Sequence, residues 1–71
     1  MADDPARYEI TVAGHLGPTL LAAFPALEAR QRGTDTVLTG PLPDSAALFG
    51  VLAAIETCRL ELLELRKLPR A

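Results

Sequence analysis

The chain has 71 residues, 49% of them hydrophobic, and a formal net charge of −2 at neutral pH. This length makes one domain with one small core, and the acidic balance without an extended basic patch argues against nucleic acid as a partner. The single cysteine, Cys58, rules out an internal disulfide, and the single histidine, His15, removes most metal constellations. We therefore expect no metal and no cofactor.

No apolar run approaches the roughly 20 residues that span a bilayer. The first residues, Met-Ala-Asp-Asp-Pro, resemble neither a signal peptide nor a transit peptide. We expect a cytoplasmic protein without membrane contact, with residues 1–6 as a disordered tail and residues 7–68 as a single domain.

The first predicted strand covers Arg7–Ala13, where Tyr8, Ile10 and Val12 alternate with mostly polar residues. Two glycines break this strand, and Pro18 suits the first turn of a short helix over residues 18–24, which Pro25 ends. A weak edge strand is expected over residues 27–32, because the turn at residues 33–35 leads into a clear strand at residues 36–39.

Residues 40–43, Gly-Pro-Leu-Pro, predict a break. Asp44 and Ser45 are both good N-caps for a helix over residues 45–57. The last predicted strand, residues 60–66, departs from regular alternation because its leucines fall on both faces.

This order of elements predicts an α+β fold, the ferredoxin-like split βαβ plait, with a four-stranded antiparallel sheet and two helices on one face. The expected strand order is 4-1-3-2. The expected core is Ile10, Val12, Leu38, Leu48, Leu52 and Ile55.

The most suggestive segment for ligand binding is the loop that contains Gly14, His15 and Gly17, because free N–H groups at a helix start can hold an anion. A tight connection that needs glycine geometry, with a solvated histidine, explains the same residues. Ser45 has no histidine near it in the sequence, and no catalytic triad or acid/base pair can be assembled. No catalytic residue is predicted.

An interaction surface is predicted from apolar residues that a single plait leaves uncovered. Two helices cover only one face of the sheet, so one of two leucine sets in the last strand, Leu60 with Leu62 or Leu63 with Leu65, should be exposed. Leu62 and Val37 are the residues expected at the interface. Phe49 lies off the helical stripe of Leu48 and Leu52, which makes it either an interaction anchor or the outer member of a wide stripe.

Three segments, residues 8–14, 36–44 and 47–52, resemble small single-domain proteins common in actinobacterial genomes. The resemblance extends over about residues 8–65 and implies a bacterial origin but no particular reaction. The plan also looks like that of ACT regulatory domains, RNA-recognition motifs and heavy-metal-associated domains. This chain has no Cys-x-x-Cys pair and lacks the strand aromatics that RNA binding requires.

The leading hypothesis is a non-enzymatic module that self-associates as a homodimer and binds a protein partner. The alternative is an ACT-like module that binds a small ligand at the loop of residues 14–18. An enzyme centred on His15 ranks third, since fold analogy alone assigns no activity.

Overall fold

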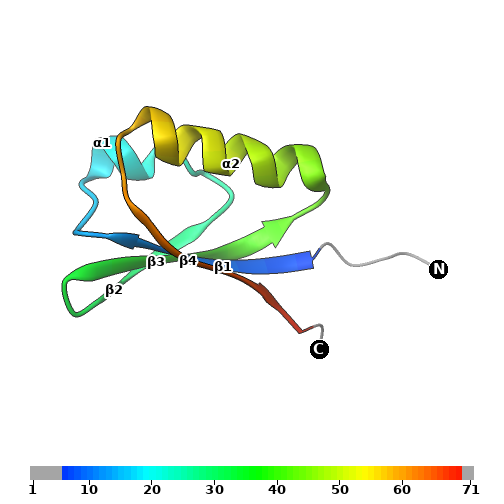
Figure 1. Ribbon diagram of the computed structural model, residues 1–71, viewed down its shortest axis with the longest axis horizontal. Coiled ribbons are helices and arrows are strands. Elements are labelled where there is room, and N and C mark those ends of the chain that lie inside the picture. The colour runs from blue at the N-terminus through cyan, green and yellow to red at the C-terminus, as the bar shows by residue number, and fades with distance from the viewer. Residues whose placement is uncertain (1–5, 70–71) are drawn as a thin grey trace.

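A computed structural model describes residues 6–69 of the chain, which form six elements in the order strand, helix, strand, strand, helix, strand (Figure 1). Their bounds are β1 Ala6–Ala13, α1 Pro18–Leu21, β2 Glu28–Arg32, β3 Asp35–Leu42, α2 Ser45–Thr57 and β4 Leu62–Leu68. Residues 1–5 of the predicted tail over residues 1–6 lie outside the described residues, whereas Ala6 belongs to β1 and not to a tail.

The four strands form one antiparallel sheet in the order β2-β3-β1-β4. Read from the other edge, this is the predicted order 4-1-3-2. Both helices lie on the same side of the sheet (Figure 1). The predicted α+β fold, with a four-stranded antiparallel sheet and two helices, is therefore confirmed. β1 and β3 occupy the centre of the sheet, and β2 and β4 are its edges.

Alternation along the strands separates a helix-covered face from an open face. Ile10 lies opposite Leu38, and these two side chains form the centre of the core beneath the helices, together with Val12, Phe24 and Ile55. Leu52 packs against this cluster as predicted, whereas Leu48 is only half-buried and lies outside it.

The bounds of α2 are those predicted, because both of its ends are coded locally. At its start the Asp44 carboxylate accepts a hydrogen bond of 2.8 Å from the backbone N–H of Ala47. At its end the N–H groups of Arg59 and Leu60 donate to the carbonyls of Glu56 and Ile55, which is a Schellman motif. Arg59 adopts a φ of 59°, where glycine is the usual residue.

The Schellman motif also corrects the predicted start of the last strand. The N–H of Leu60 donates to the carbonyl of Ile55 at the end of α2, and Leu60 packs against the core cluster. β4 therefore begins at Leu62 instead of residue 60, and it continues to Leu68.

The first helix is shorter than predicted and ends at Leu21 instead of residue 24. After α1 the hydrogen bonds span three residues: the N–H of Ala23 donates to the carbonyl of Leu20, and the N–H of Phe24 donates to the carbonyl of Leu21. Such three-residue turns fit the approach to Pro25, because the residue before a proline avoids the α conformation. Phe24 is still buried at 3% exposure, so it packs into the core from a turn.

The predicted break at residues 40–43 is wrong in its first part, since β3 continues through Gly40 and Pro41 to Leu42. Beyond Thr39 the strand pairs only with β1, because β2 begins at Glu28, which lies opposite Thr39. A proline costs no ladder hydrogen bond where its nitrogen faces an unpaired side. Gly40 is needed there because a Cβ would lie 2.5 Å from the carbonyl oxygen of Ala26.

Candidate functional site

The open face of the sheet gathers charged side chains from all four strands. The strand registers place Arg30, Val37, Thr11 and Glu64 in one row across the sheet, and Glu28, Thr39, Glu9 and Arg66 in the next. Because directly opposed residues in a sheet share a face, the charged members of both rows project from the side that carries no helix. The uncovered face is therefore polar and of mixed charge.

Glu9 is the centre of this surface. Its carboxylate lies 3.3 Å from Nη1 of Arg66 and 3.9 Å from Nη2 of Arg32, and its side chain is only 13% exposed. Arg32 reaches Glu9 from the edge strand β2, two strands away, so its aliphatic stem crosses the middle of the open face.

This crossing corrects the expectation that Val37 is exposed. The registers place Val37 between Arg32 and Glu9, and the side chain is 1% exposed. Thr11, opposite Val37, is buried as well, and its hydroxyl has no hydrogen-bond partner among the described residues. Val37 therefore presents no area to a partner in this conformation.

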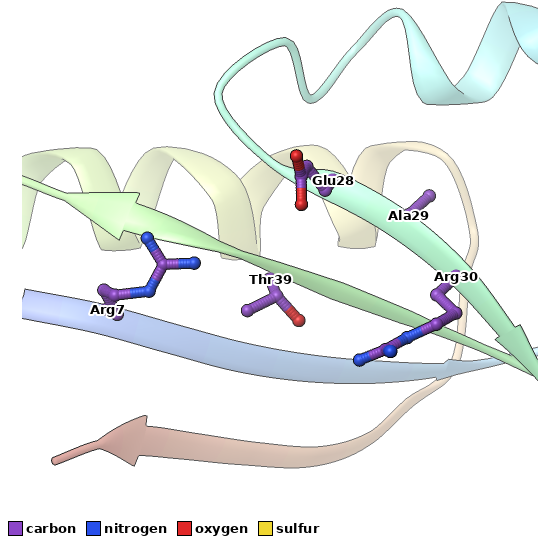
Figure 2. A pocket seen from close by; sticks show the side chains of 5 residues that line it. All are labelled: Arg7, Glu28, Ala29, Arg30 and Thr39. Carbon is purple, nitrogen blue, oxygen red and sulfur yellow. The ribbon is translucent and has the colours of Figure 1, made fainter.

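A shallow hollow of about 590 Å³ lies beside β2 and β3 and is lined by Arg7, Glu28, Ala29, Arg30 and Thr39. Figure 2 shows the side chains of Arg7 and Arg30 on either side of Thr39. Within residues 6–69 neither arginine takes part in an ion pair. Guanidinium and hydroxyl donors suit a carboxylate or a phosphate, whereas Glu28 opposes a ligand that is only anionic.

The sequence interpretation missed this hollow, although the signal was present. Period-two alternation places Arg7 on the same face as Glu9, and Arg30 on the same face as Arg32. What the sequence lacks is the register that brings β1 and β2 to the two sides of Thr39.

The loop of Gly14, His15 and Gly17 is held by two hydrogen bonds to β3 and its hairpin. Nε2 of the exposed His15 donates to the carbonyl of Gly33 over 3.0 Å, and the buried Thr36 hydroxyl donates to the carbonyl of Gly14 over 2.7 Å. Gly14 requires its glycine, with a φ of 85°.

The helix that follows this loop offers little to an anion, because α1 has four residues and few aligned peptide dipoles. A hollow of about 160 Å³ nearby is lined by Leu16 and by residues of α1, β2 and β3, but not by Gly14, His15 or Gly17. The loop therefore has the contacts of a structural connection.

The two edge strands of the sheet differ in the exposed apolar side chains that they carry. The edge strand β2 has the sequence Glu-Ala-Arg-Gln-Arg, and all five residues are exposed. The edge strand β4 carries three leucines with large exposed fractions, 42% for Leu62, 47% for Leu63 and 39% for Leu65. A register shift opposite Thr11 and Val12 marks a bulge, and regular pairing with β1 runs from Glu64 to Leu68.

The predicted interface residues do not form one patch. Leu62 lies at the β4 edge opposite Val12, and Val37 is buried on the open face. Phe49 is 65% exposed on α2, so it is not a member of the core stripe.

Within residues 6–69, no group of three or more histidine, cysteine, aspartate or glutamate side chains is placed to hold a metal ion. None of the described helices has the length and apolar character needed to cross a membrane. Cys58 is a free thiol, half-buried at the C-cap of α2.

These features define a small α+β domain with a charged open face, a shallow arginine-lined hollow and one sheet edge that carries exposed leucines. Residues 7–66 match the family described as "Domain of unknown function (DUF8691)", and the chain belongs to this family. No curated protein and no solved structure gives a significant match to the chain.

Proposed function

We propose that the protein is a self-association module whose edge strand β4 binds a second copy of the chain. The observation that supports this proposal is the contrast between the two edges of the sheet. Sheet edges that stay unpaired are usually protected by charge. Both edge strands carry three charged residues, but β2 has no large apolar side chain, whereas β4 adds three exposed leucines.

The free energy gained by burying these leucines is modest but sufficient to give a measurable dimer. Burying the exposed 39–47% of each leucine contributes roughly 0.6–1.4 kcal/mol, from the full value for a leucine side chain. Three leucines in each of two copies then contribute on the order of 4–8 kcal/mol, and each backbone hydrogen bond across the edge adds about 0.5–1.5 kcal/mol. Because association costs about 4–15 kcal/mol, we expect a dimer of micromolar to millimolar dissociation constant.

Sedimentation equilibrium from micromolar to millimolar concentration tests the proposal. The mass should rise with concentration from 7.6 kDa toward twice that value. The variant Leu63→Lys should shift this rise to higher concentration, because it puts a charge into the shared edge.

The matched control is Phe49→Lys, which replaces another exposed apolar side chain away from the β4 strand. It should melt like the parent and keep the parent's association curve. A parent chain that stays monomeric at millimolar concentration would overturn the proposal. So would association that is lost in the Phe49 variant and kept in the Leu63 variant, which would point to α2 as the contact.

A further inference from the structure

The sequence of β4 fixes how two copies can meet, an inference that rests on the proposed self-association. In the regular part of the strand Leu65 lies opposite Ile10 on the helix side. Glu64 and Arg66 lie opposite Thr11 and Glu9, and therefore project from the open face. The two charges flank Leu65 symmetrically, one on each side.

Symmetry limits the possible registers. Two identical antiparallel edges with their helices on the same side are related by a two-fold axis perpendicular to the sheet. Opposed residues must share a face, so the axis has to pass beside a residue that meets its own copy. In the regular segment the candidates for this position are residues 64–68.

Charge separates these candidates. An axis at Glu64 sets two glutamates against each other, and axes at Arg66 or Lys67 oppose two cations, which is unfavourable for directly opposed side chains. An axis at Leu68 leaves little strand to pair, because β4 ends there.

We propose that the two-fold axis passes through Leu65. Leu65 then packs against Leu65 of the second copy, and Glu64 lies opposite Arg66 of that copy, twice in each dimer. Leu63 lies beside the aliphatic stem of Lys67 of the second copy. The Leu65 pair and the Glu64–Arg66 pairs come from the regular part of β4, whereas Leu63 lies at the bulge.

The side chains needed for these cross-pairs are accessible in the single chain. Glu64 is 52% exposed and Arg66 is 56% exposed. Their contact within the chain is loose, with Nε of Arg66 4.0 Å from Glu64, and the closer partner Glu9 occupies only one guanidinium nitrogen at 3.3 Å. The guanidinium therefore retains donors for a second carboxylate.

Charge reversal tests this register, with circular dichroism used to select conditions in which each variant is folded, because Arg66 also pairs with Glu9 within the chain. Glu64→Arg alone opposes four cations at the axis, and Arg66→Glu alone opposes four anions, so each variant should sediment as a monomer of about 7.6 kDa where the parent is dimeric. An equimolar mixture of the two variants restores both opposite-charge pairs. The mixture should therefore dimerise although neither component does, and the doubly reversed chain should dimerise with itself.

Disulfide trapping provides a second measurement that is independent of charge. In a Cys58→Ser background, Leu65→Cys places two thiols opposite each other and should give a covalent dimer on oxidation. The control Leu68→Cys places its two thiols six residues apart along the strands, roughly 20 Å, and should stay unlinked.

The outcomes separate the two proposals. A parent that never dimerises overturns the self-association itself. A dimeric parent whose charge-reversed variants also dimerise alone, or whose mixed variants stay monomeric, overturns the register at Leu65 and leaves self-association standing. Cross-linking at residue 68 but not at residue 65 overturns the register as well.

Discussion

Replacing Gly40 by alanine should destabilise the domain strongly, because the chain before β2 crosses directly over this position. A Cβ at Gly40 would lie 2.5 Å from the carbonyl oxygen of Ala26 and 2.9 Å from Cδ2 of Leu27. The leucine end can move, but the carbonyl belongs to the backbone. Overpacking usually costs about 1–3 kcal/mol, and a backbone clash belongs at the upper end of that range.

A domain of this size has a net stability of only about 3–5 kcal/mol. A loss near 2–3 kcal/mol should lower the melting temperature by roughly 10–20 °C, given the 4–8 °C per kcal/mol typical of such domains. Gly50→Ala is the matched control, since a Cβ there meets nothing within 4 Å and Gly50 lies inside α2. Helix propensity should make that variant more stable by about 0.5–1 kcal/mol.

Thermal melts followed by circular dichroism measure both variants, at one fixed protein concentration because dimerisation makes the melting temperature depend on concentration. A Gly40→Ala variant that melts within a few degrees of the parent would refute the close crossing of Ala26 and Leu27 over β3. If Gly50→Ala instead lost as much stability as Gly40→Ala, the loss would be a general effect of alanine and not of a clash at Gly40.

Four further substitutions have expected outcomes. Arg59→Gly should raise stability by about 1 kcal/mol in urea unfolding, because it relieves a non-glycine residue at a φ of 59°, and no gain would argue against that conformation. Thr11→Val should stabilise the domain by about 1 kcal/mol, because the buried Thr11 hydroxyl has no hydrogen-bond partner among the described residues. Thr36→Val should destabilise the domain by a similar amount, because it removes the hydrogen bond to the Gly14 carbonyl. Equal effects of the two substitutions would contradict this difference in hydrogen bonding. His15→Ala should lose less than about 1 kcal/mol, since its hydrogen bond is exposed, and an unfolded variant would show a larger structural role.

Local signals in the sequence carried the predictions that were confirmed. Asp44 caps α2 through its own side chain, and alternation in β1 places Ile10 and Val12 in the core. Residues 28–32 form a strand despite poor strand propensity, because the two-residue turn at Gly33 and Thr34, with a φ of 61° at Gly33, returns the chain against β3.

The predictions that were wrong depend on contacts between distant segments. β3 can continue through Pro41 because β2 begins at Glu28, opposite Thr39, and leaves Pro41 without a partner on that side. The residues near Pro41 do not indicate where β2 begins. Val37 is buried because Arg32 reaches across to Glu9. The late start of β4 is a local exception: the Schellman motif that precedes it uses Leu60, and Arg59 stands in the position where glycine would have indicated the motif.

Amide hydrogen exchange at low and high protein concentration tests the proposed use of the β4 edge most directly. Outward-facing N–H groups of β4 should exchange quickly in dilute solution and become protected as the dimer forms, while those of the charged edge strand β2 should not change. Protection that does not depend on concentration in β4, or that appears at β2 instead, would contradict self-association through this edge.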